Sequence, residues 1–157
     1  MTDDAKITRI LTTVKTIALV GWSPKADRPS HRVAAYLAAR GYRVIPVNPV
    51  AAGQTILGEP VYATLDELPA VHDMVDIFRN SEAAGPITDD AIRIGAKTVW
   101  MQLGVRNDAA AARAEAAGLN VVMNRCPKIE YGRLSGELGW SGVNTGVISA
   151  KRMGPPR

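Results

Sequence analysis

A short loop after the first apolar run of the sequence combines groups that bind anions. Gly21 ends the run Ile17–Val20, and the polar loop that follows carries Lys25 and Arg28. Ser30 then stands where a helix is predicted to begin, as an N-cap. Free backbone N–H groups at a helix start bind phosphate, and nearby cations strengthen that binding. The stretch therefore predicts a phosphate-binding loop.

Donor groups also follow the other apolar runs. These segments are residues 48–49, 78–80, 102–104 and 124–126. They supply amide and guanidinium groups, and Trp22 and Phe78 are expected to add flat apolar surfaces. Like residues 21–25, they contain no histidine and no carboxylate, whereas acid–base catalysis needs such groups. The set predicts ligand binding, and no residue is assigned to catalysis or to metal binding.

The elements that position these groups are short apolar runs that alternate with helical patterns. Strands are predicted over 16–20, 42–47, 74–78, 97–101 and 119–123. Helices are predicted over 4–14, 30–40 and 81–94, with a further helix from Asn107 or Asp108 to Gly118. Because each crossover between parallel strands covers a face of the sheet, the pattern predicts an α/β fold of three layers around a parallel five-stranded sheet. The donor groups are then expected to meet at the carboxyl edge of that sheet.

Two prolines refine this arrangement. Pro46 lies in the second predicted strand, where its missing N–H favours an edge position. Pro86 lies inside the helix 81–94, which is expected to be kinked or split there. Between the second and third strands, residues 48–60 are predicted as a turn and its continuation, and residues 65–68 as one helical turn after Thr64.

The overall composition is that of one globular domain. The 157 residues are 46% hydrophobic and 22% charged, and the formal net charge is +4. Lysine and arginine are scattered, which argues against a nucleic-acid partner. No apolar run approaches the roughly 20 residues of a membrane span, and the N-terminus lacks a secretory pattern. With one cysteine, Cys126, the chain is expected to be cytoplasmic.

Two departures from the usual dinucleotide-binding pattern bear on the ligand. The glycine loop reads G-W-S-P-K where that pattern has G-x-G-x-x-G. Val47-Asn48-Pro49 stands where NAD-binding proteins place an acid for the ribose hydroxyls. Standard NAD binding is therefore disfavoured. A ligand with an extra phosphate on its ribose suits the cationic loop, and both NADP and coenzyme A qualify.

Several separated motifs resemble one known family in order along residues 16–134. They are VGWSPKADRPSHRVAAYL, GYRVIPVNPVAAGQTILGEPVY, VDIFRNSEAA, GAKTVWMQLGV and NRCPKIEY. The chain resembles the small stand-alone CoA-binding proteins, which are similar to the N-terminal domain of the succinyl-CoA synthetase α subunit. The resemblance implies a Rossmann-like domain over residues 1–134. Coenzyme A would lie across the segments that leave the carboxyl ends of the strands, called here the strand exits. Residues 135–157, rich in Gly and Ser, are expected to form an irregular tail.

The same resemblance implies a role for individual residues. It places the nucleotide phosphates at Gly21, Trp22, Ser23, Lys25, Arg28 and Ser30. It places the adenosine beside Val47, Asn48 and Pro49, with Ile56 closing over the adenine. It borders the pantetheine arm with Phe78, Arg79 and Asn80, and sets Gln102 and Asn124 further along. The phosphorylated histidine of the larger synthetases is not expected here, since the chain has only His31 and His72.

The leading prediction is therefore a protein that binds coenzyme A or acyl-CoA and is not catalytic on its own. An NADP-dependent oxidoreductase and an acyl-CoA ligase subunit remain alternatives, as does a regulatory sensor that signals through residues 135–157. A homodimer or a protein partner is also left open. Cys126 is interpreted first as a buried, inert cysteine; if it lines the pocket, a mixed disulfide with the coenzyme A thiol is a testable hypothesis.

Overall fold

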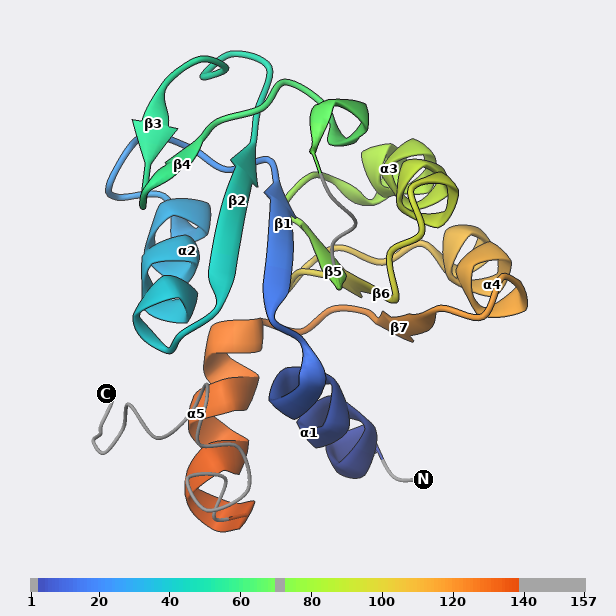
Figure 1. Ribbon diagram of the computed structural model, residues 1–157. Helices are drawn as coiled ribbons and strands as arrows, with labels where there is room; N and C mark the ends of the chain where they lie inside the picture. The colour runs from blue at the N-terminus through green and yellow to red at the C-terminus, as the bar shows by residue number, and fades with distance from the viewer. Residues whose placement is uncertain (1–2, 70–72, 139–157) are drawn as a thin grey trace.

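Five strands form one parallel sheet in the computed structural model, which describes residues 3–69 and 73–138 (Figure 1). The sheet order is β2-β1-β5-β6-β7 and every neighbouring pair is parallel, so the predicted fold class is confirmed. The chain moves outward from β1 to β2 and then returns to the other side of β1 at β5. The topological switch point therefore lies between β1 and β5. The strands are β1 (Thr16–Val20), β2 (Arg43–Val47), β5 (Met74–Ile77), β6 (Thr98–Met101) and β7 (Asn120–Val122).

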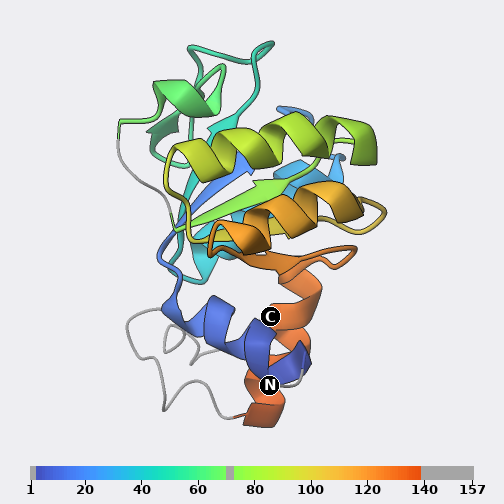
Figure 2. The same cartoon turned by 90° about the vertical axis from the view of Figure 1, so that its right-hand side faces the viewer.

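Helices cover both faces of this sheet because successive side chains of each strand point to opposite sides. Ile17 and Leu19 pack in a core with α2 (Pro29–Ala39), α1 (Asp3–Thr13) and α5 (Pro127–Leu138). Ala18 and Val20 pack in a second core that includes residues of α3 (Ser81–Arg93) and α4 (Asp108–Ala116). Figure 2 shows α3 and α4 side by side over their face, with α1 and α5 below.

Pro46 lies on an edge strand, as its missing N–H predicts. β2 pairs with β1 on one side only, and residues 59–62 partly cover its free side. The cover includes a small hairpin of β3 (Thr55–Ile56) and β4 (Glu59–Pro60), where only a turn was predicted. Each strand has two residues, which is too short to leave an alternating pattern in the sequence. A 3₁₀ turn, η1 (Leu65–Glu67), follows where one helical turn was predicted.

The helix predictions need three corrections. The second helix begins at Pro29, so Arg28 is the N-cap residue and Ser30 lies inside the first turn. α3 is not split at Pro86 but continues through it as one element, because a single lost hydrogen bond does not outweigh the packing of its buried face. α5 extends to Leu138, so residues 135–138 are helical and not part of an irregular tail. The rest of the predicted tail and His72 lie outside the described residues.

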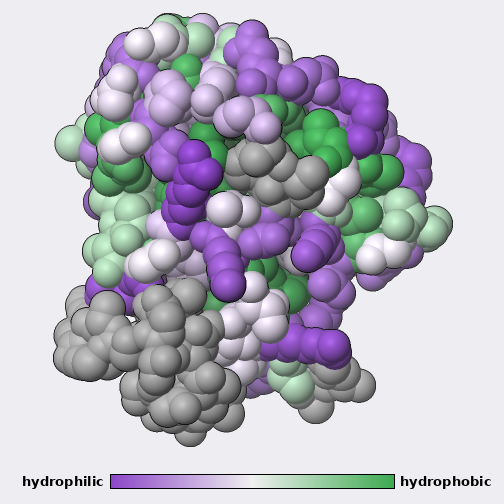
Figure 3. Space-filling model, in the orientation of Figure 1, coloured by the Kyte–Doolittle hydropathy of each residue, from purple (hydrophilic) through white to green (hydrophobic). Residues whose placement is uncertain are grey.

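The surface in Figure 3 mixes hydrophilic and hydrophobic residues without one continuous apolar area among the coloured atoms. Among the described residues, no helix combines the length and hydrophobicity needed to cross a membrane. The same part of the chain holds no group of three or more His, Cys, Asp or Glu side chains that could bind a metal ion.

Candidate ligand site at the strand exits

The exits of β1, β2 and β5 are joined directly at the switch point. The Gly21 N–H donates to the Val47 carbonyl oxygen at 2.9 Å, and the Phe78 N–H donates to the Val20 carbonyl oxygen at 2.8 Å. Gly21 has a φ of +92°, and a Cβ there would lie 2.6 Å from the Phe78 carbonyl oxygen. Only glycine allows this close approach of two backbones.

A first cavity of about 660 Å³ opens beside this junction. It lies over the exits of β1, β2 and β5, between residues 63–65 and α3. Its walls are mainly apolar, and its charged side chains are Arg79 and Asp90. The lining residues are Val20, Gly21, Val47, Asn48, Pro49, Val50, Ala63, Thr64, Leu65, Phe78, Arg79, Ile87 and Asp90.

A second cavity of about 400 Å³ lies between the first turn of α2 and the start of α5. Phe78 lines both cavities, so the two cavities are neighbours at this residue. The second cavity has apolar walls and two cations, Arg32 and Lys128. Its lining residues are Pro29, Arg32, Val33, Phe78, Gln102, Leu103, Cys126, Lys128 and Ile129.

The loop between β1 and α2 is held by its own hydrogen bonds. The Ser23 N–H donates to Ser30 Oγ at 3.0 Å, and the Lys25 N–H donates to Ser23 Oγ at 3.2 Å. Ser30 thus acts from inside the helix and supports the loop instead of capping α2. Trp22, expected to offer a flat surface to the ligand, is only 1% exposed and stacks on His31, with ring centroids 5.6 Å apart. Its ring belongs to the core, so only its backbone faces the loop.

Four backbone N–H groups of this loop, those of Trp22, Ala26, Asp27 and Ser30, donate no hydrogen bond to the described residues. Ala26 and Asp27 are exposed, whereas Trp22 and Ser30 are buried. The bond from the Ser23 N–H to Ser30 Oγ holds Ser30 next to the residue that follows Trp22. The side chains of Lys25 and Arg28 are exposed on the same loop and line neither cavity. An anion at this loop would meet unpaired donors together with positive charge.

The predicted asparagines serve mainly to shape the strand exits. Asn48 Nδ2 donates to the Trp22 carbonyl oxygen at 2.6 Å, and Asn48 Oδ1 accepts from the Val50 N–H at 2.8 Å. Asn80 is the N-cap of α3 and accepts from the Ala83 N–H at 2.8 Å. Asn124 has a φ of +59° and accepts from the Gly104 N–H at 2.8 Å. Asn48 lines the first cavity, whereas Asn80 and Asn124 line neither of these two cavities.

Two buried side chains near the second cavity have oxygen atoms without a hydrogen-bond partner among the described residues. Gln102 lines the cavity and is 6% exposed, and its Oε1 accepts no hydrogen bond. Asp76 is 0% exposed in the middle of β5, and neither of its carboxyl oxygens has a partner. Burial therefore raises the pKa of Asp76 well above its ordinary value. Side chains alternate along β5, so Asp76 lies on the same face of the sheet as Phe78. It is two residues before Phe78, which lines the cavity.

The structure thus gathers part of the predicted set. Gly21, Val47, Asn48, Pro49, Phe78 and Arg79 line the first cavity, and Phe78 and Gln102 line the second. Ile56 lines neither, because its hairpin packs it against the core on the α2 side. Four further lining residues were not predicted from the sequence: Ile87 and Asp90 in the first cavity, and Lys128 and Ile129 in the second. Ile87 and Asp90 are spaced i, i+3 on α3, which is a signal for one helix face once its direction is known.

The sequence matches the model of a known protein family over most of its length. The family described as CoA binding domain matches residues 15–132. Uncharacterized protein YneT from Bacillus subtilis (strain 168) is 34% identical over 127 residues, which are 81% of this chain and 93% of that protein.

Solved structures show the same fold. A protein of Thermus thermophilus, cell-free ID.343, is 34% identical with a TM-score of 0.80, covering 85% of this chain and 99% of that one. A hypothetical protein from Pyrococcus horikoshii OT3 is 40% identical with a TM-score of 0.79, covering 85% and 92% respectively.

Proposed function

The chain belongs to the CoA binding domain family, and we propose that it binds coenzyme A or an acyl-CoA across the strand exits. The adenosine occupies the first cavity, the diphosphate meets the loop between β1 and α2, and the pantetheine arm passes Phe78 toward the second cavity. The observation that carries this proposal is the pair of cavities that meet at Phe78, beside a loop with unpaired N–H groups. No catalytic role is proposed.

The chemistry of the first cavity favours a nucleoside over a phosphate. Its walls are mainly apolar, which suits a flat base. Asp90 is a carboxylate on that wall, paired with Arg93 at 2.9 Å, and its remaining lone pairs can accept hydrogen bonds from amino or hydroxyl groups. The bulk of the negative charge of the ligand is therefore expected outside this cavity, at the loop between β1 and α2.

That loop supplies the donors for phosphate. The unpaired N–H groups of Trp22 and Ser30 suit the diphosphate oxygens, and Lys25 and Arg28 suit the third phosphate on the ribose. These cations are exposed, so each contact is expected to contribute up to about 1 kcal/mol. Isothermal titration with coenzyme A, dephospho-CoA and NADP tests this assignment. Tightest binding is expected for coenzyme A, whereas tighter binding of NADP would favour the oxidoreductase alternative.

A double variant tests the role of the two loop cations. Lys25→Ala with Arg28→Ala is expected to weaken coenzyme A binding roughly tenfold and to leave dephospho-CoA binding nearly unchanged. Arg9→Ala with Lys15→Ala removes the same charge from exposed positions that precede β1, whereas the loop follows β1, and serves as the matched control. Equal losses for coenzyme A and dephospho-CoA in the loop variant would contradict recognition of the third phosphate.

A further inference from the structure

We propose that Cys126 forms a disulfide with the sulfur of coenzyme A in the second cavity. This inference rests on the proposed function and adds a covalent state to it. Cys126 is the one cysteine of the sequence, is 5% exposed, and lines the cavity together with Phe78 and Gln102. The residues around it, and not the cysteine by itself, point to the thiol-bearing arm of coenzyme A as the ligand.

Gln102 supplies an independent sign that this cavity takes a polar ligand. The residue is only 6% exposed, and its Oε1 accepts no hydrogen bond from the described residues. A buried amide oxygen without a partner destabilises the empty site, and a hydrogen bond from a ligand N–H removes that cost. The pantetheine arm carries two amide groups with N–H donors between the diphosphate and the sulfur. A purely apolar ligand would leave Gln102 unpaired.

The position of the cavity matches the order of groups along coenzyme A. Pro29 and Arg32 belong to the first turn of α2, next to the loop proposed to hold the diphosphate, and Cys126 precedes α5 on the opposite wall. Val33 and Ile129 add apolar walls between them. An arm that leaves the diphosphate at α2 and crosses this cavity therefore ends near Cys126 Sγ.

The reaction is a thiol–disulfide exchange with the symmetrical disulfide of coenzyme A. The Cys126 thiolate attacks one sulfur of that disulfide, a new Sγ–S bond forms, and the bond between the two coenzyme A sulfurs breaks. The Cys126 sulfur is oxidised, the released coenzyme A leaves as a thiolate and is reduced, and the proton lost by Cys126 passes to solvent. Arg32 and Lys128 stabilise the negative charge of the departing thiolate.

The leaving half of the disulfide has an open path. Leu103 and Ile129 line the cavity and are 54% and 53% exposed, so the cavity opens to solvent beside Cys126. The half that remains bound can therefore occupy the loop and the cavities while the other half projects outward.

Intact mass spectrometry of the reduced full chain, incubated under native conditions with coenzyme A disulfide, tests the proposal. One adduct is expected, with the mass of one coenzyme A less two hydrogen atoms, and dithiothreitol should remove it. It should form at least about tenfold faster than the adduct with oxidised glutathione, because binding raises the effective concentration of the disulfide at Cys126. Equal rates with the two disulfides would show an ordinary reactive cysteine and overturn the proposal.

Variants and a binding measurement separate this inference from the proposed function. Cys126→Ser and Cys126→Ala should form no adduct, and Gln102→Leu should slow the adduct about three- to tenfold. If the reduced chain binds coenzyme A but no adduct forms, the covalent state is wrong and the proposed function stands. If the chain neither binds reduced coenzyme A nor prefers its disulfide over glutathione, both are wrong.

Discussion

Two features of the backbone require glycine at position 21, where the ends of β1 and β5 meet. The φ of +92° suits glycine alone, and the Phe78 carbonyl oxygen occupies the space of a Cβ at 2.6 Å. The β1 exit therefore approaches the β5 exit more closely than any other residue type allows. Since Phe78 lines both cavities, a shift at this junction would change both of them.

Gly21→Ala tests this dependence against a matched control. Gly53 has a similar φ of +94°, but a Cβ there meets no atom within 4 Å. Gly53→Ala should therefore lower the free energy of unfolding by roughly 1–3 kcal/mol, which is the cost of holding alanine at a positive φ without any steric clash. Gly21→Ala should lose more and should also weaken coenzyme A binding. Denaturant unfolding and calorimetric titration of both variants measure this, and equal losses of stability with unchanged binding would contradict the account.

Asp76 makes the free energy of unfolding fall as the pH rises, whereas a carboxylate paired with a cation makes it rise. Desolvation raises its pKa well above 3.8, so the folded chain keeps the proton at pH values where the unfolded chain has lost it. This group favours the folded state fully only below the unfolded pKa, and its contribution is lost as the pH rises toward the folded pKa. Asp76 thus lowers stability progressively above about pH 4.

Asp76→Asn removes that titration while keeping the side-chain shape. The variant and the parent chain should differ least near pH 4, and the variant should become the more stable of the two as the pH rises toward 8. Urea unfolding at several pH values measures the difference. A parent chain that gains stability relative to the variant with rising pH would show that Asp76 is ionised and paired.

At the residue scale, the sequence predicted positions better than roles. Gly21, Asn48 and Phe78 lie at the site because strand exits of a parallel sheet share one edge, a rule that needs no side-chain detail. The burial of Trp22 was not predictable, because a tryptophan in a loop can face the core or the ligand equally well. Asp76 was overlooked as an acid within an apolar run, although an acid in a strand buried on both faces is itself unusual.

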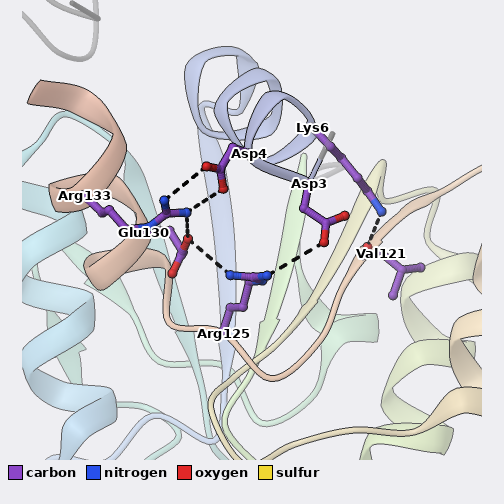
Figure 4. Close-up of polar contacts among 7 residues, drawn as sticks. All are labelled: Asp3, Asp4, Lys6, Val121, Arg125, Glu130 and Arg133. Carbon is purple, nitrogen blue, oxygen red and sulfur yellow. Dashed lines mark hydrogen bonds and ion pairs between the residues drawn. The ribbon is translucent and has the colours of Figure 1, made fainter. Parts of the chain in front are cut away.

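At the scale of elements, α1 and α5 are joined by a network of charged side chains (Figure 4). Arg133 donates to Asp4 and to Glu130, each at 2.7 Å, and Arg125 lies 3.6 Å from Glu130. The hydrogen bond from Arg133 lowers the pKa of Asp4, so its contribution to stability is present above about pH 4 and is lost as the pH falls through the lower folded value. The network fixes the start of α5, so it also positions Lys128 on that helix and Cys126 just before it in the wall of the second cavity.

Glu130→Gln tests the centre of this network. The Glu130 side chain is only 8% exposed, and losing its charge leaves two arginines without their shared partner. The free energy of unfolding is expected to fall by about 1–3 kcal/mol. Glu115→Gln, an exposed change of the same type on α4, should change it by less than about 0.5 kcal/mol. Similar effects of the two substitutions on denaturant unfolding would mean that the network contributes little.

The sequence predicted the sheet elements more completely than α5. Each strand is an apolar run between turn residues, a pattern that survives without tertiary information. α5 contains Gly132 and Gly136, which weaken its intrinsic helix preference, and it forms because Tyr131 and Leu134 are buried against α1 and α2. Its stability is a property of the assembled core, so a local pattern could not reveal it.

At the scale of the whole molecule, the sheet order creates the candidate site. β1 lies between β2 and β5, so the first crossover places α2 on one face and the later one places α3 on the other. The crevice between them holds the loop after β1, with one cavity on each side of Phe78. The location of the site follows from this topology, whereas the division into two cavities depends on side chains of α3 and α5.

A crystal structure of the chain with coenzyme A tests the central claim most directly. The account predicts adenosine in the first cavity, diphosphate oxygens within hydrogen-bond distance of the Trp22 and Ser30 N–H groups, and the pantetheine arm beside Gln102. Coenzyme A bound elsewhere, or a crevice that stays empty at saturating coenzyme A, would contradict it.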